Sequence, residues 1–293
     1  MGVDVRIKNR QIFKKALKIN DITLGKYKYG SLDNYWRNTD ELVEGRNVLY
    51  NPNHIGRGIE FQWSDNLKDE IALRVNFLST KYDMEMFYEV IRNILHVWKA
   101  KSFEHDASIY TEADLDELCK KQREFNLNYM AGIDQISITT IFGAMHPIDL
   151  DKERVKSFGE NKDEEGFADY LHALQYPDAY YAVPIIYKLN DTAFFGSYAI
   201  TAETDTIFPK KASDPMMFKN PDTGEPLKCS FFVVTLVSLE KNRAVGRMAF
   251  DEFVEKAGIM NCPEHDMTHV FLKGLSEDKI FELAESEHYD PLA

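Results

Sequence analysis

The sequence contains few cysteines, no long apolar run and no recognised catalytic signature. Its three cysteines, Cys119, Cys229 and Cys262, are an odd and sparse set, which argues against a disulfide framework and is typical of a reducing compartment. No apolar segment follows the first basic residues, so no secretory signal is visible. The longest apolar run, residues 231–239, is far too short to cross a membrane. We therefore expect a cytoplasmic protein with no membrane partner.

Basic residues are also in deficit. The chain carries 48 acidic residues against 35 basic ones, which gives a formal charge of −13. A mean field of this sign repels phosphate backbones and anionic lipid, so we expect no nucleic-acid partner. The same imbalance is one reason to expect a protein partner instead. The composition predicts no oligomeric state.

The first half of the chain shows clear strand and helix patterns. Apolar and polar residues alternate over residues 3–7 and, on both sides of a polar turn, over 59–77. Such alternation predicts an opening strand and then a β-hairpin with one wet face. Apolar residues at helical spacing predict helices over 83–101 and 111–131. A further strand is expected to include Ile136, Ile138 and Ile141.

The second half repeats this order of elements after a polar segment. Residues 151–166 carry few apolar side chains and are the best linker candidate, so we expect halves at 1–150 and 151–293. The fold class is then α+β, with mostly antiparallel sheets each covered by helices and two layers that could resemble each other. In the second half we expect strands within 180–202 and 229–239, and helices over 249–257 and 276–285.

One irregular loop, residues 51–58, leads directly into the hairpin and contains His54 and Arg57 beside two glycines. Glycine lets the backbone approach a ligand, and the arginine fork suits a carboxylate or phosphate. His54 and Arg57 are therefore candidate ligand-binding residues. The alternative is structural: a turn, a bulge formed by the glycines, and an arginine paired with a surface acid.

A second segment has the spacing of metal ligands. Cys262, His265 and His269 form a C-x2-H-x3-H pattern, to which His288 or Cys229 could add a fourth donor for zinc. No general base stands at a defined register, so the pattern favours a structural zinc over a catalytic one. The alternative is a polar loop between a helix and a strand, and apart from this zinc we expect no cofactor.

A third feature is the long connection over residues 204–227, which is rich in Pro, Asp and Lys. Connections of this length are typically functional or mobile, so the segment is a candidate lid or interaction surface.

Several segments resemble an uncharacterised protein family. The opening residues 3–9, the segment 50–60, and the hairpin and long helix that follow are similar to domain of unknown function 4299, a family of Gram-positive bacteria. The resemblance covers nearly the whole chain. It implies a bacterial cytoplasmic protein without an assigned activity, and it supplies no site residues.

Two classes of function remain open on the sequence, and neither establishes an enzyme. The first, which we favour, is a non-catalytic interaction or regulatory protein, including the immunity-like kind. Its support is the charge, the connection over 204–227 and the missing catalytic signature. The alternative is a metal-binding protein or hydrolase that uses Cys262, His265 and His269, or an anion-binding protein that uses Arg57.

Overall fold

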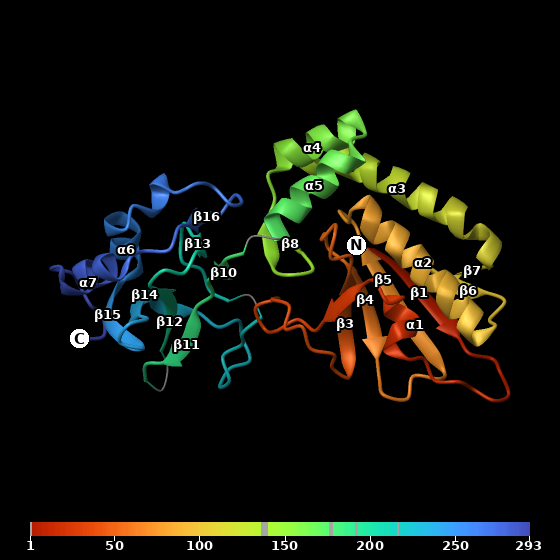
Figure 1. Ribbon diagram of the computed structural model, residues 1–293, viewed down its shortest axis with the longest axis horizontal. Helices are drawn as coiled ribbons and strands as arrows, with labels where there is room; N and C mark the ends of the chain where they lie inside the picture. Colours follow the sequence, from red (N-terminus) through yellow and green to blue (C-terminus); the bar gives the residue numbers. More distant parts are fainter. Residues whose placement is uncertain (1, 136–139, 176–177, 191–192, 216) are drawn as a thin grey trace. The chain divides into compact units, whose positions relative to one another are not determined.

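The chain forms two compact units, Met1–Tyr176 and Pro177–Ala293 (Figure 1). The computed structural model describes residues 2–293 except 136–139, 176–177, 191–192 and 216. The division lies after the expected position at residue 150, because the expected linker is helical. Helix α4 (Lys152–Asn161) and helix α5 (Glu164–Gln175) belong to the first unit.

The first unit is built on a seven-stranded sheet with the order β2-β3-β4-β5-β1-β6-β7, and every pairing in it is antiparallel. The hairpin expected over residues 59–77 is present as β4 and β5, and the expected opening strand is β1. The strands are β1 (Gly2–Lys8), β2 (Lys28–Gly30), β3 (Gly45–Tyr50), β4 (Ile59–Trp63), β5 (Glu70–Asn76), β6 (Phe103–His105) and β7 (Ser108–Tyr110).

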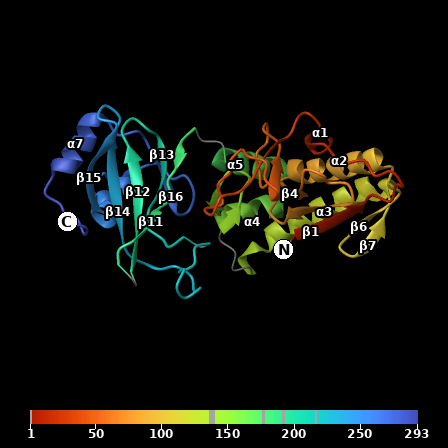
Figure 2. The ribbon, with the colours of Figure 1, turned by 90° about the horizontal axis from the view of Figure 1, so that it is seen from below.

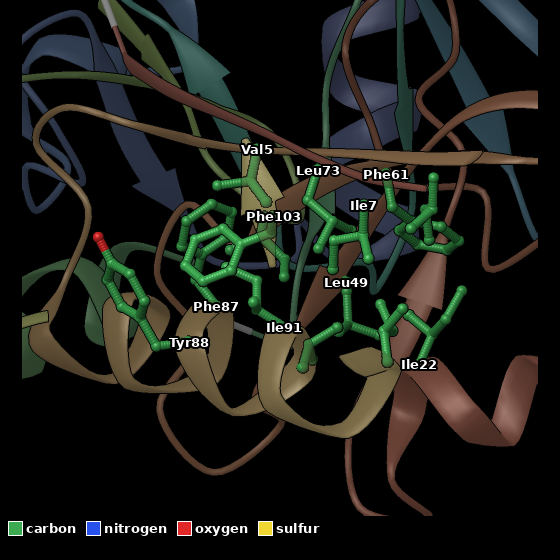
Figure 3. Packing of buried hydrophobic residues seen from close by; sticks show 14 of the residues in the cluster. Val5, Ile7, Ile22, Leu49, Phe61, Leu73, Phe87, Tyr88, Ile91 and Phe103 are labelled. Carbon is green, nitrogen blue, oxygen red and sulfur yellow. The ribbon is translucent and has the colours of Figure 1, made fainter. Parts of the chain in front are cut away.

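Helices α1 (Ile19–Thr23) and α2 (Lys81–Trp98) cover the dry face of this sheet. Figure 3 shows Phe87 and Ile91 of α2 directed toward Val5 and Leu73 of the sheet, all four buried. Alternation of apolar residues along the strands brings them to this face, and each buried side chain of this size stabilises the fold by about 1.5–3 kcal/mol. The wet faces of β4 and β5 remain free to form a polar surface.

Helix α2 begins at the capping box formed by Thr80 and Asp83. The Thr80 hydroxyl accepts a hydrogen bond from the Asp83 N–H at 3.1 Å, and the Asp83 carboxylate accepts one from the Thr80 N–H at 2.9 Å. The helix ends at Trp98 because Lys99 adopts a left-handed conformation with φ 48°. It therefore begins two residues before and ends three residues before the expected bounds of 83–101.

A second layer of the first unit is formed by α3 (Leu115–Ala131), α4, α5 and the β8 (Thr140–Phe142) and β9 (Pro147–Asp149) hairpin. Helix α3 follows a 3-10 turn, Glu112–Asp114, within the expected range of 111–131. These helices and the hairpin share a core that includes Ile141 and Leu171. Of the strand expected after α3, Ile136 and Ile138 lie outside the described residues.

The second unit contains a four-stranded sheet and a smaller three-stranded one. The four strands β11 (Ile185–Lys188), β12 (Phe194–Thr201), β14 (Cys229–Ser238) and β15 (Arg243–Ala249) lie side by side in that order (Figure 2). Helices α6 (Phe250–Lys256) and α7 (Glu277–Glu285) share a core with this sheet. The three-stranded sheet has the order β10 (Tyr180–Tyr181), β13 (Thr206–Pro209) and β16 (His269–Leu272).

Two expectations for the second unit change in detail. The first of the two strands expected within 180–202 is divided into β10 and β11, with Pro184 between them, and the second is β12. The connection expected over 204–227 contains β13, all four of whose residues are buried. After β13, the described residues of the connection belong to no helix or strand.

The fold class is α+β with mostly antiparallel sheets, as the sequence predicts. The parallel pairs are β12 with β14 and β10 with β13. The sheets of the two units differ in strand number and order, so they are not copies of one layer. In the described part of the chain no helix combines the length and apolar character needed to cross a membrane.

Candidate ligand-binding cavity

The loop at residues 51–58 is shaped by one turn and two close backbone contacts. The Asn51 side chain accepts a hydrogen bond from the Asn53 N–H at 3.0 Å, which forms the turn. A Cβ atom on Gly56 would lie 2.4 Å from Oδ2 of Asp83. Gly58 has φ +67°, and a Cβ there would lie 2.5 Å from the Leu49 carbonyl oxygen. The two glycines therefore let the loop lie directly on the start of α2 and on β3.

Arg57 connects three segments of the first unit. Its N–H donates to Oδ2 of Asp83 at 3.1 Å, and its Nε donates to the carbonyl oxygen of Phe142 at 3.0 Å. Its Nη1 donates to the carbonyl oxygen of Phe77, at the end of β5. In the described part of the chain the guanidinium forms no ion pair, and Nη2 has no acceptor. The expected alternative, an arginine paired with a surface acid, is therefore wrong.

Arg57 lies at a cavity of about 500 Å³ in the first unit. The wet face of the sheet supplies the polar side, including Arg46 of β3, Glu60 of β4 and Arg74 of β5. The apolar side includes Val48 of β3 and Phe77 and Leu78, which follow β5. Residues distant from these strands in sequence complete it, and they are Leu32, Trp36, Tyr129, Ile141 and Phe142. A cavity of this size with a few convergent polar groups is the usual form of a small-molecule site.

The other two arginines in the cavity have acidic partners. Nη2 of Arg46 lies 2.7 Å from Oε1 of Glu60, and Nη1 of Arg74 lies 2.6 Å from Oδ2 of Asp4. Strand register brings these groups together, since Arg74 is opposite Glu60 on one side and opposite Asp4 on the other. Asn76 also donates to Oε1 of Glu60, at 2.8 Å. The polar wall is thus a hydrogen-bonded network. Of the three arginines that line the cavity, only Arg57 has no carboxylate partner among the described residues.

Burial changes the acid strength of two groups at the loop. Desolvation lowers the pKa of Arg57 to about 10, and Asp83 and Glu60 partly oppose this shift. Burial raises the pKa of Asp83, although hydrogen bonds from Thr80, Arg57 and Gly58 oppose the change. Arg57 therefore remains charged at neutral pH in surroundings that solvate the charge poorly.

Aromatic rings form part of the apolar wall. The rings of Trp36 and Phe142 are stacked with centroids 3.9 Å apart, and the Arg46 guanidinium lies 5.0 Å from the Trp36 ring centroid. Trp36 has φ 61°, a left-handed conformation that is rare for a large side chain. Its buried Nε1 has no hydrogen-bond acceptor among the described residues. The strain and the free donor are both typical of a functional position.

His54, the second residue that the loop suggested, does not line the cavity. Its ring stacks on Tyr82, with centroids 3.7 Å apart, and lies 6.5 Å from the His172 ring. Nδ1 of His172 accepts a hydrogen bond from the Ile55 N–H at 2.9 Å. Burial, and then the charge of His54, lower the pKa of His172. His54 and His172 thus hold the loop through contacts with Tyr82 and Ile55, which do not line the cavity.

The expected zinc donors are in the second unit and are not brought together. Among the described residues, Cys262, His265 and His269 do not form a group with ligand atoms within 4.8 Å of one another. The Cys262 thiol lies 3.9 Å from the Gly258 carbonyl oxygen, whereas His269 Nδ1 lies 2.9 Å from Asp266 Oδ1. A tight turn, in which the His265 N–H donates to the His269 carbonyl oxygen, accounts for the spacing without a metal.

The possible fourth donors have other partners. His288 contacts the carbonyl oxygens of Ser286 and Arg247 through its two ring nitrogens, at 2.6 and 2.7 Å. Burial, followed by the Asp214 carboxylate, raises the pKa of Cys229 to about 12, which disfavours the thiolate that zinc requires. The segment is better described as a structural turn.

Sequence patterns pointed to Arg57 but missed most of the cavity. Glu60 and Arg74 were visible as wet-face residues of the hairpin, so their proximity to Arg57 could have been inferred. Trp36 and Phe142 carried no signal, because neither lies in a strong periodic pattern and they meet only in the folded chain.

The fold and this site define an α+β protein with an arginine-lined cavity in its first unit. The chain belongs to the family described as domain of unknown function (DUF4299), which matches residues 2–283. Neither the curated proteins nor the solved structures include a match to the chain.

Proposed function

We propose that the first unit binds a small anionic ligand in the cavity at Arg57. The observation that carries this proposal is the Arg57 guanidinium, which lines the cavity without a carboxylate partner among the described residues. A partly buried charge without an ion-pair partner is unfavourable, and an anion bound beside it would relieve that cost.

The position of Arg57 also favours binding. Two backbone carbonyl oxygens, those of Phe77 and Phe142, fix its side chain before any ligand arrives. A pre-ordered side chain loses little conformational entropy on binding, so more of the interaction energy appears as affinity. The three segments joined by Arg57 would be stabilised together when the site is filled.

Thermal unfolding in a panel of anions tests the proposal. Sodium chloride, sulfate, phosphate and acetate are compared at equal ionic strength for the wild type and Arg57→Lys. We expect at least one anion to raise the Tm of the wild type, since a ligand that binds only the folded state at about 100 times its Kd adds roughly 2.7 kcal/mol. Arg57→Lys should lose this increase. The matched control Arg92→Lys, on the exposed side of α2, should keep it.

A second function, the interaction protein that the sequence favours, is supported by the second unit. Edge strand β11 exposes Ile185 and Tyr187, by 53% and 45%, and Leu189 follows with 44% exposure. The Tyr187 ring stacks with Phe195 at 5.2 Å, and Phe195 stacks with Phe231 at 5.4 Å. We propose that this chain is a regulatory or immunity-like protein and that an extended apolar segment of its protein partner adds to this edge, because unpaired edge strands can pair with another chain.

A photo-crosslinking residue in place of Tyr187 tests this second function in the native host. One adduct of defined mass is expected there, and it should disappear when Ile185→Lys is added. A crosslinker in place of Lys241, in the β14–β15 turn, is the control and should give no adduct. Equal labelling from both positions would refute a specific edge interaction.

We also propose that the chain acts in the cytoplasm of a Gram-positive bacterium. The free thiols of Cys119, Cys229 and Cys262 support a reducing compartment. The bacterial source follows from the resemblance described above.

A further inference from the structure

We propose that the ligand of the Arg57 cavity is a monocarboxylate with an apolar body, and this inference rests on the proposed anion site. Three observations distinguish this class from phosphates and from bare inorganic ions. They are the charge balance of the polar wall, the donors left on Arg57, and the composition of the rest of the cavity.

The charge balance leaves one positive charge unmatched. Arg46 is paired with Glu60 and Arg74 is paired with Asp4, so of the three arginines that line the cavity only Arg57 has no ion pair with a described residue. Asp83, the other acid near Arg57, accepts four hydrogen bonds at the N-terminus of α2, whose dipole favours a negative charge there. A single negative charge on the ligand completes the balance, whereas a dianionic phosphate exceeds it.

The polar wall also opposes a second negative charge. Glu60 lines the cavity together with Arg57, and its Oε2 accepts no hydrogen bond from the described residues. A dianion beside Arg57 would therefore lie near the Glu60 carboxylate, and like charges at close range repel. A carboxylate places less charge near Glu60.

The unused donors of Arg57 match the two oxygens of a carboxylate. A guanidinium has five N–H groups, and the described residues accept two of them, one from Nε and one from Nη1. The remaining three include both hydrogens of Nη2. One hydrogen from each Nη atom can meet the two oxygens of a carboxylate in the bidentate arrangement typical of arginine.

The apolar wall requires a ligand body beyond the charged group. The cavity of about 500 Å³ is much larger than an inorganic oxyanion, and aliphatic side chains and rings line its other side. Burying a ligand's apolar surface against Val48, Ile141 and Phe142 adds the hydrophobic contribution of about 25 cal/mol per Å². A small inorganic anion would leave this wall in contact with water.

Two sets of matched compounds test the head group and the body separately. Phenylacetate, phenylacetamide and phenyl phosphate share a ring, and octanoate, octanamide and octyl phosphate share a chain. Their Kd values for the full-length protein are measured by calorimetry at a pH where the phosphates are dianions. We expect at least one carboxylate to bind about tenfold or more tightly than its amide and its phosphate, since charge-assisted bidentate bonds are the strong ones.

Two variants test whether the compounds bind in the Arg57 cavity. Arg57→Lys keeps the charge and removes the fork, so carboxylate binding should weaken by about tenfold or more. Glu60→Gln keeps the accepting oxygen that Arg46 and Asn76 contact while removing the negative charge. It should strengthen phosphate binding relative to carboxylate binding, and a folded Glu60→Gln therefore tests the inference even if Arg57→Lys unfolds.

The possible outcomes separate the inference from the anion site itself. Tighter binding of the phosphates in the wild type would overturn the monocarboxylate while leaving the anion site intact. Equal binding of amides and carboxylates would overturn both. Binding of none of the six compounds, together with an Arg57-dependent rise of Tm in an inorganic anion, would also overturn only the monocarboxylate.

Discussion

Asp83 holds the backbone of Arg57 through a hydrogen bond of 3.1 Å from the Arg57 N–H to Oδ2, while the same carboxylate caps helix α2. Oδ1 of Asp83 accepts a second bond from the Gly58 N–H at 2.9 Å. The loop that carries the cavity arginine and the start of the main helix therefore depend on one buried side chain. Loss of that side chain is expected to affect both stability and binding.

Asp83→Asn should destabilise the first unit by about 3 kcal/mol, because an amide NH₂ would replace an oxygen that faces N–H donors. Ligand binding at Arg57 should weaken as well, since the loop loses its anchor. Urea unfolding at pH 7 measures the first effect. Glu117→Gln, an exposed acid in the first turn of α3, is the control and should change stability by less than about 0.5 kcal/mol. An Asp83→Asn protein as stable as the wild type would contradict the role of this carboxylate.

Gly58→Ala should destabilise the protein more than Gly25→Ala. The two glycines have nearly the same φ, +67° and +69°, so the cost of a left-handed alanine, about 1–2 kcal/mol, is common to both. Only at Gly58 would the added Cβ also meet the Leu49 carbonyl oxygen, at 2.5 Å, whereas nothing lies within 4 Å at Gly25. The difference between the two variants in the free energy of unfolding, obtained from urea unfolding, measures the cost of the contact between the added Cβ and β3. Equal losses of stability would contradict it.

The free energy of unfolding should fall as the pH drops below about 6.5, in part through His172. Burial and then His54 lower the pKa of His172 in the folded protein below its ordinary value of 6.5, so the unfolded chain binds more protons in this range. The stabilisation is complete above the pKa of His172 in the unfolded chain. It is lost as the pH falls toward the lower pKa of His172 in the folded protein. Protonation would also remove the acceptor for the Ile55 N–H.

His172→Asn isolates this contribution, since an asparagine side chain retains an acceptor near Nδ1 and does not titrate. Urea unfolding between pH 5 and 8 should show a shallower loss of stability in the variant and parallel curves at the upper end of the range. A residual slope is expected in both proteins because burial also lowers the pKa of His105. Identical slopes for the variant and the wild type would exclude His172 as a source of the pH dependence.

The three cysteines should react slowly with iodoacetamide at pH 7.5. Burial raises the pKa of Cys119 to about 11 and, with Asp214, that of Cys229 to about 12, and burial also raises the pKa of Cys262. Very little thiolate is then present, and the thiolate is the reactive form. Mass spectrometry over time should find full labelling only after unfolding in urea. Rapid labelling of Cys262 in the folded protein would contradict this expectation and would favour a reactive or metal-binding role for Cys262.

The sequence predicted those parts of the fold that depend on local periodicity. Alternation over residues 59–77 predicted β4 and β5, and helical spacing predicted α2. These patterns exist because the apolar face of the hairpin and the apolar face of the helix are buried against each other. The expected division at residue 150 differed from the structure because residues 151–166 are polar for another reason. Helix α4 buries only Val155 and Gly159, and a helix with so narrow an apolar face resembles a linker in composition.

The site was predictable only where residue type carries the information. Arg57 could be identified from its charge and its glycine neighbours, but its partners are the backbone carbonyls of Phe77 and Phe142, which no residue pattern reveals. The zinc prediction relied on spacing alone. Asp266 holds the intervening turn by accepting from the Thr268 and His269 N–H groups, so the spacing of His265 and His269 has a local structural cause.

The most direct test of the central claim follows the Arg57 side chain itself. In ¹⁵N-labelled protein, the Nε–Hε signal of Arg57 is assigned by its loss in Arg57→Lys and is followed while phenylacetate or octanoate is added. The claim predicts that this signal shifts and saturates along the same binding curve found by calorimetry, while that of the exposed Arg92 stays in place. An Arg57 signal that does not move while a carboxylate binds, or the absence of binding by any anion, would contradict it.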